Sequence, residues 1–131
     1  MPAFPRIWIR ALMGAVIAGA ATLAQALEVK PFSAETLAAA QAAGKPVAVH
    51  FHAEWCGTCK QQEKAIAQLR SETGLDVLLL VADYDKEKDL RKALRVRSQS
   101  TMVVFRGKDE RARLAGDTSA EKFRTALRAA L

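Results

Sequence analysis

The sequence is poor in cysteine, with only Cys56 and Cys59 among its 131 residues. A small fold held together by several disulfides is therefore excluded. The two cysteines are spaced Cys-x-x-Cys, so a bond between them closes a very short loop, and chain entropy gives short loops the least stabilisation. We therefore expect a pair that reacts, rather than a purely structural bridge.

A dense basic block with interleaved aromatic residues, which would indicate nucleic-acid binding, is also missing. The net charge is +6, but acidic residues lie between the basic ones. This pattern is typical of a solvated, mixed-charge surface, so we expect no nucleic-acid partner. Attraction to acidic partners or to a membrane surface stays open. The sequence shows no internal repeat, low-complexity linker or second domain.

The first 26 residues have the pattern of an export signal. Arg6 and Arg10 give a positive start, residues 11–23 are apolar, and Ala24-Gln25-Ala26 is an A-x-A cleavage signature. The apolar run is shorter than the roughly 20 residues of a spanning helix. We therefore expect cleavage near Ala26.

The sequence signals of two other export routes are missing. No cysteine stands directly after the cleavage site to carry a lipid, and no Arg-Arg pair points to the twin-arginine route. The expected organisation is a signal peptide over 1–26 and one small exported, periplasmic domain over 27–131. Retention as an uncleaved anchor is the alternative. We expect contact with the membrane only transiently or through such an anchor.

Strands and helices are expected to alternate after residue 26. Apolar and β-branched runs predict strands, and the intervening segments have helix-forming composition. The expected strands are 28–32, 47–52, 77–82, 101–105 and 111–115. The expected helices are 33–43, 60–70, 86–94 and 118–131, where the ranges of the first and last helix include the N-cap residue.

Helix ends and faces support these assignments. Ser33 and Asp85 are expected N-caps, and Thr118 to Glu121 has the spacing of a capping box. Phe123, Leu127 and Leu131 recur every four residues, which predicts one buried face. The element order predicts an α/β fold with helices on both faces of a mixed central sheet, which is antiparallel at its final hairpin.

The segment from Phe51 to Lys60, Phe-His-Ala-Glu-Trp-Cys-Gly-Thr-Cys-Lys, resembles the active-site segment of thioredoxins. The order of strands and helices fits that resemblance through Leu131. The chain therefore resembles an exported, bacterial-type member of the thioredoxin-like superfamily. The resemblance implies the thioredoxin fold, protein-disulfide reductase activity, disulfide-containing protein substrates and no bound cofactor. We expect a monomer.

Each cysteine has an expected role in exchange. Cys56 is the exposed nucleophile, because the start of a helix favours its thiolate. Cys59 then attacks Cys56 and releases the reduced partner. The reverse steps oxidise a partner, so the motif fixes no direction. The resemblance favours a reductase, and an oxidising compartment would require a membrane thiol-electron donor.

The residues around the cysteines depart from the usual thioredoxin pattern. Gly57 is followed by Thr58, where family members often have proline, so an extra N–H and hydroxyl can reach the thiolate and change the redox potential. Trp55 is expected to shield the site and offer a flat contact surface, with ordinary packing at the sheet edge as the alternative.

Two further departures lie farther along the chain. His50 stands where thioredoxins hold a buried acid, and it either exchanges a proton with Cys59 near neutral pH or is a buried neutral histidine bonded to a backbone carbonyl. Ser100, just before Thr101, replaces the family's cis-proline. A cis bond without proline costs about 2.5 to 4 kcal/mol, so we expect a trans peptide and a rearranged loop that alters partner choice.

Two other functions compete with exchange. His50, His52, Cys56 and Cys59 form His-x-His-x3-Cys-x2-Cys, and thiolates with imidazoles suit copper(I) or zinc, so a metal carrier is the main alternative. A redox-inert interaction module is the second, although the intact cysteine pair argues against it.

Overall fold

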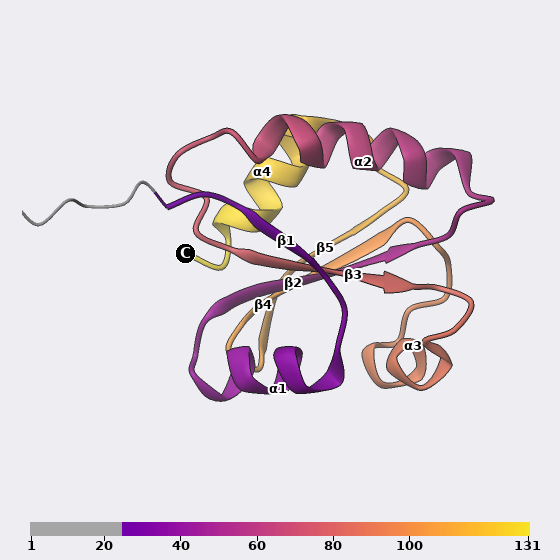
Figure 1. Cartoon of the computed structure of the whole chain (residues 1–131), viewed down its shortest axis with the longest axis horizontal. Coiled ribbons are helices and arrows are strands. Elements are labelled where there is room, and N and C mark those ends of the chain that lie inside the picture. Colours follow the sequence, from indigo (N-terminus) through magenta and orange to yellow (C-terminus); the bar gives the residue numbers. More distant parts are fainter. Residues whose placement is uncertain (1–24) are drawn as a thin grey trace, which may run out of the picture.

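The computed structural model describes residues 25–131 (Figure 1). The expected signal segment therefore lies, except for its last two residues, outside the described residues. Ala26 forms an isolated antiparallel bridge with Thr73, and the Gly74 N–H donates to the Gln25 carbonyl at 2.9 Å. Among residues 25–131, no helix is long and apolar enough to cross a membrane.

Strands and helices alternate along the described chain, close to the expected positions. They are β1 (Glu28–Pro31), α1 (Ala34–Ala42), β2 (Pro46–His52), α2 (Gly57–Leu69), β3 (Leu78–Asp83), α3 (Lys88–Leu94), β4 (Thr101–Arg106), β5 (Asp109–Ala115) and α4 (Ala120–Arg128).

The strands form one mixed sheet with the order β1-β3-β2-β4-β5. β3 pairs in parallel with both β1 and β2, whereas β4 pairs antiparallel with β2 and β5. Helices α2 and α4 cover one face of the sheet, and α1 and α3 cover the other (Figure 1). The expected α/β architecture is confirmed.

Alternation along β2 divides the core between these two faces. Val47, Val49 and Phe51 pack with α1 and α3, whereas Ala48 packs with α2 and α4. His50, two residues after Ala48, therefore lies on the face that α2 covers.

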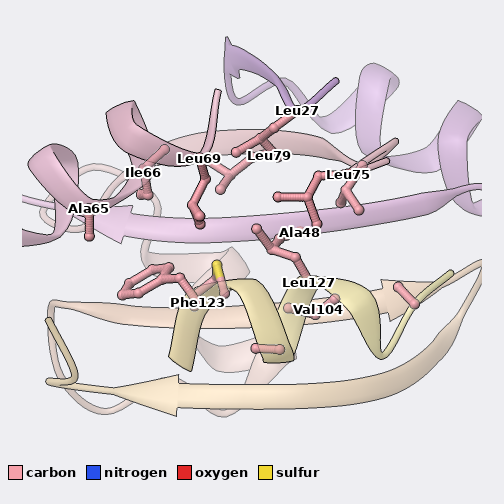
Figure 2. Close-up of a cluster of buried hydrophobic side chains, with 14 residues drawn as sticks. Leu27, Ala48, Ala65, Ile66, Leu69, Leu75, Leu79, Val104, Phe123 and Leu127 are labelled. Atoms are coloured by element: carbon pink, nitrogen blue, oxygen red, sulfur yellow. The ribbon is translucent and has the colours of Figure 1, made fainter. Parts of the chain in front are cut away.

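The cluster beneath α2 and α4 fixes the helix that carries the cysteines (Figure 2). Leu69 of α2, Leu79 of β3 and Phe123 and Leu127 of α4 are completely buried. Burying each such side chain contributes about 1.5 to 3 kcal/mol. This packing holds the axis of α2 against the sheet, so the first turn of α2 keeps a fixed position at the end of β2.

Helix caps were only partly predictable. Ser33 caps α1 as expected, and its Oγ accepts the Thr36 N–H at 3.1 Å. The expected cap of α3 is wrong, because Glu87 occupies the N-cap position without a side-chain bond. The Asp85 carboxylate instead accepts a hydrogen bond from the Trp55 indole.

The expected ends of α4 also need correction. Its N-cap is Ser119 and not Thr118. Leu131 lies beyond the helix and is 52% exposed, so its expected place on the buried face is wrong. The N–H groups of Ala130 and Leu131 bond to carbonyls three residues back. This tighter winding takes Leu131 out of the 3.6-residue register.

Replacing Ser119 by alanine should lower the free energy of unfolding by about 0.5 to 1 kcal/mol, because the Lys122 N–H loses its side-chain acceptor. Thr118→Ala is the matched control and should change stability much less. Urea unfolding of both variants measures the difference. A larger loss for Thr118→Ala would favour the capping box expected from the sequence.

Candidate active site

Cys56 lies at the turn between β2 and α2, in the N-cap position of the helix. Its backbone is extended, with φ −92° and ψ 109°, and its Sγ accepts the Cys59 N–H at 3.1 Å. The Cys56 sulfur thus takes the capping role usual for a serine or aspartate oxygen. As a result α2 begins at Gly57, three residues before the expected start. Unpaired N–H groups and the helix dipole at this end favour a thiolate.

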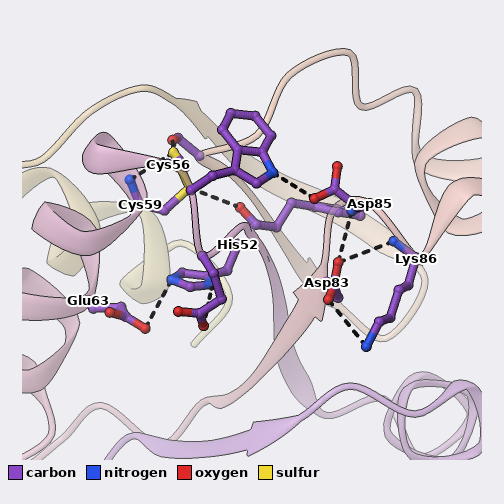
Figure 3. Close-up of polar contacts among 11 residues, drawn as sticks. His52, Cys56, Cys59, Glu63, Asp83, Asp85 and Lys86 are labelled. Carbon is purple, nitrogen blue, oxygen red and sulfur yellow. Dashed lines mark hydrogen bonds and ion pairs between the residues drawn. A yellow bond between two sulfur atoms is a disulfide. The ribbon is translucent and has the colours of Figure 1, made fainter.

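Cys56 and Cys59 form a disulfide, with their Cα atoms 5.2 Å apart (Figure 3). Cys56 is 4% exposed and Cys59 is fully buried. The expected exposure of Cys56 is therefore wrong for the oxidised protein, because its sulfur turns back over the first turn of α2. Cys56 is still the more accessible of the two.

Ser100 brings a third polar group to the sulfurs. Its Oγ lies 3.1 Å from Cys56 Sγ and 3.2 Å from Cys59 Sγ. The described residues contain no cis peptide bond, so the expected trans peptide is confirmed. Ser100 adopts φ 65°, a left-handed conformation that it shares with Arg95 alone among the described non-glycine residues.

Gln62 holds Ser100 in place, although the sequence pattern did not single it out. It is fully buried on α2, and its Nε2 donates to the carbonyls of Ser100 at 2.9 Å and Asp117 at 2.7 Å. The only sequence signal was a polar residue three positions after Cys59 and four before Ile66, on the face of α2 that packs against the sheet.

His50 completes this hydrogen-bonded group. Its Nε2 lies 2.7 Å from Gln62 Oε1. Because both Gln62 N–H groups point at carbonyls, Oε1 must accept, and His50 Nε2 must carry a proton. Burial lowers the pKa of His50 to about 4, although the bond to Gln62 opposes this and the charge of His52 adds to it. His50 is therefore neutral near pH 7.

His50 is buried and neutral, as one of the two expectations for this residue states, but its hydrogen-bond partner is not the expected one. Its Nε2 partner is an amide side chain, and neither a backbone carbonyl nor Cys59. The nearest polar contact of Cys59 Sγ on β2 is instead the Phe51 carbonyl, at 3.9 Å. Direct proton exchange between His50 and Cys59 has no hydrogen bond to carry it.

His52 is buried beside the same helix start. Its Nε2 lies 3.1 Å from Glu63 Oε1, close enough for an ion pair although the angle is not that of a hydrogen bond (Figure 3). Its Nδ1 lies 3.9 Å from Glu54 Oε1. His52 is thus directed at carboxylates.

The histidines and cysteines do not form a metal site. The ring centroids of His50 and His52 lie 6.3 Å apart, and the rings face Gln62 and Glu63. Within residues 25–131, no group of three or more histidine, cysteine, aspartate or glutamate side chains could hold a metal ion. The metal-carrier alternative therefore has no support.

Trp55 stands out from the surface next to the disulfide. It is 62% exposed, and its Nε1 donates to Asp85 Oδ2 at 2.7 Å. The ring is therefore not packed against the sheet edge. Tyr84 packs beside Cys56 and Cys59 from the loop after β3.

The remaining expected site residues lie at the edges of the site. Gly57 and Thr58 are exposed in the first turn of α2, and the N–H that reaches Cys56 Sγ comes from Cys59 and not from Thr58. Thr101 is buried, and its Oγ1 donates to the Ser98 carbonyl at 2.9 Å. Thr101 therefore fixes the loop that presents Ser100.

Comparisons with known proteins agree with this geometry. A family model described as Thioredoxin matches residues 26–129. Thioredoxin-1 of Drosophila melanogaster is 33% identical over 72 residues, which cover 55% of this chain and 67% of that protein. The crystal structure of Trxlp from Edwardsiella tarda EIB202 superposes with a TM-score of 0.71 at 31% identity, covering 76% of this chain and 98% of that one.

A further relative is the thiol:disulfide interchange protein DsbD of Ralstonia nicotianae. It is 33% identical over 106 residues, which cover 74% of this chain but only 17% of that protein. This chain is therefore similar to a short part of a much longer protein, about the length of one domain.

A disulfide at the strand-to-helix turn of this mixed sheet defines a thiol–disulfide oxidoreductase. The chain belongs to the thioredoxin family.

Proposed function

We propose that this protein is exported and reduces disulfides in other proteins through Cys56 and Cys59. The observation that carries the proposal is the Cys56 sulfur at the N-terminus of α2, bonded to Cys59 and accepting its N–H. A sulfur in this position is favoured as a thiolate, which is the attacking species in exchange.

The reaction runs in two balanced steps. The Cys56 thiolate attacks one sulfur of the partner's disulfide, forms a mixed disulfide and leaves the partner's second sulfur as a thiolate. That thiolate takes the proton of Cys59, through solvent. The Cys59 thiolate then attacks Cys56 Sγ and expels the partner's remaining sulfur. Two electrons have passed to the partner, and Cys56 and Cys59 are again a disulfide.

The exposed face of Trp55 suits contact with a protein substrate. An aromatic ring offers a large, rigid surface at a small cost in conformational entropy. Its bond to Asp85 fixes the ring next to the disulfide. We propose that a partner chain covers Trp55 while its disulfide reaches Cys56.

Export is proposed from the sequence of residues 1–26, with cleavage near Ala26 and a periplasmic location. An oxidising compartment would leave Cys56 and Cys59 as a disulfide. A reductase there needs electrons from elsewhere, and we propose a membrane thiol-electron donor.

Trapping in cells tests this proposal. In a full-length Cys59→Ala variant, Cys56 can still attack a partner, but no thiol is left to resolve the mixed disulfide. We expect disulfide-linked adducts outside the cytoplasm, on a protein whose N-terminus is Leu27. The matched control, Cys56→Ala with Cys59→Ala, should form none. Absence of adducts from the single variant, or an intact N-terminus in the cytoplasm, would contradict the proposed reaction or the proposed location, respectively.

A further inference from the structure

The Ser100 hydroxyl occupies a position between the two sulfurs. Its Oγ is nearly equidistant from them, at 3.1 and 3.2 Å, and the residue is only 3% exposed. A hydroxyl has one proton to donate and rotates freely about its C–O bond. From this position it can point its proton at either sulfur without moving its oxygen.

The backbone of Ser100 is held firmly enough to keep the hydroxyl there. Its N–H donates to the Phe51 carbonyl at 3.0 Å, and its carbonyl accepts from Gly116 at 3.0 Å and from Gln62 at 2.9 Å. These bonds connect Ser100 to the end of β2, to the loop after β5 and to α2. The oxygen of the hydroxyl is therefore preorganised relative to both cysteines.

The conformation of Ser100 is unusual for a residue with a side chain. At φ 65°, L side chains are disfavoured, and glycine is the residue that adopts this region without strain. Glycine, however, has no hydroxyl. The serine side chain therefore strains the backbone here, and what it adds over glycine is the contact of its hydroxyl with both sulfurs.

We infer that the Ser100 hydroxyl is a catalytic hydrogen-bond donor that follows the negative charge from Cys56 to Cys59 during exchange. The inference rests on the proposed exchange reaction. In the reduced protein the O–H donates to the Cys56 thiolate. Once Cys56 is bonded to a partner, the O–H turns to the Cys59 thiolate that attacks next. No proton leaves Ser100, so the balance of the reaction is unchanged.

A donor of this kind has two measurable consequences. Hydrogen bonds to an ionised sulfur are stronger than bonds to a neutral one, so the hydroxyl lowers the pKa of Cys56 in the reduced protein. It also stabilises the reduced state relative to the disulfide, which makes the protein easier to reduce. Ser100 thus raises the reduction potential of the Cys56–Cys59 pair and makes the protein a weaker reductant.

The experiment compares Ser100→Gly and Ser100→Ala with the full-length protein. Glycine removes the hydroxyl and relieves the backbone, whereas alanine removes the hydroxyl and keeps the strained Cβ. Ser98→Ala is the control, because the Ser98 hydroxyl reaches only Thr101 Oγ1, at 3.5 Å. The pKa of Cys56 is read from the pH dependence of alkylation, and the redox equilibrium is measured against glutathione.

In both Ser100 variants we expect the pKa of Cys56 to rise by about one unit. We also expect the equilibrium with glutathione to shift about tenfold toward the disulfide, equivalent to about 30 mV. Ser98→Ala should match the unsubstituted protein. Unchanged values in both Ser100 variants, or a shift in the alanine variant alone, would overturn the inference.

These measurements are independent of the proposed function. If the unsubstituted protein fails to reduce a protein disulfide such as that of insulin, the proposed function is wrong. The alkylation and glutathione measurements still report on Ser100 in that case, because neither uses a protein partner.

Discussion

Replacing Cys56 by serine lowers the rate of protein-disulfide reduction by at least about 10³-fold, because a serine hydroxyl is not ionised near neutral pH and cannot take the place of the thiolate. The position of Cys56 is the reason to expect so large a loss. It is the more accessible of the two sulfurs, and it lies at the N-terminus of α2, where the helix dipole favours its ionised form. Reduction of insulin disulfides, followed by turbidity, measures the rate.

Cys59→Ser is the matched variant and should behave differently. It should also stop turnover, but one equivalent of partner should remain covalently attached through Cys56. Mass spectrometry of the quenched reaction identifies that adduct. If Cys56→Ser accumulated adducts on Cys59 instead, the assigned order of attack would be reversed.

Acidification should destabilise the protein through His50. Its pKa is about 4 in the folded protein and about 6.5 in the unfolded chain, so the unfolded state binds more protons between these values. The contribution of neutral His50 to the free energy of unfolding is therefore fully present above pH 6.5 and is lost as the pH falls toward 4. The full loss from this one residue is on the order of 3 kcal/mol.

Urea unfolding of the oxidised protein at pH values from 7.5 to 4 checks this expectation. A His50→Gln variant keeps an amide that can bond to Gln62 but has no proton to gain in this range. It should lose most of the pH dependence between 6.5 and 4, while His52→Gln should retain it. Equal slopes for the unsubstituted protein and His50→Gln would show that the burial of His50 does not govern acid stability.

The sheet and its helices could be predicted because local patterns encode them. The continuous apolar and β-branched run of residues 47–52 and the apolar spacing of Ile66 and Leu69 on α2 depend on neighbours a few residues away. The Cys-x-x-Cys spacing carries the chemistry in the same local way. The order of these elements then leaves few topologies, because crossover connections between parallel strands are right-handed.

The interior of the site depends on contacts between distant parts of the chain, which local patterns do not encode. The Ser100 hydroxyl meets Cys56 across 44 residues, and the Gln62 amide meets Asp117 across 55. A replaced cis-proline indicated that Ser100 would matter, but not that its hydroxyl would reach both sulfurs. The role of Gln62 could not be separated from ordinary helix composition.

Errors at helix ends have a similar cause. Asp85 has a good capping side chain, but the Trp55 indole uses its carboxylate. The expected exposure of Cys56 is wrong because the oxidised sulfur caps α2 and lies beside Ser100. In each case a tertiary partner competes with the local preference, and the sequence does not show that partner.

The reduction potential of the Cys56–Cys59 pair tests the central claim most directly. The full-length protein is equilibrated in glutathione buffers, and the fraction of disulfide is measured after acid quenching. An exchanging pair should give one two-electron transition at a potential above about −300 mV, within reach of biological thiols. A reduction potential of the pair below about −300 mV would instead be that of a structural disulfide. That result would contradict the assignment of this site to thiol–disulfide exchange.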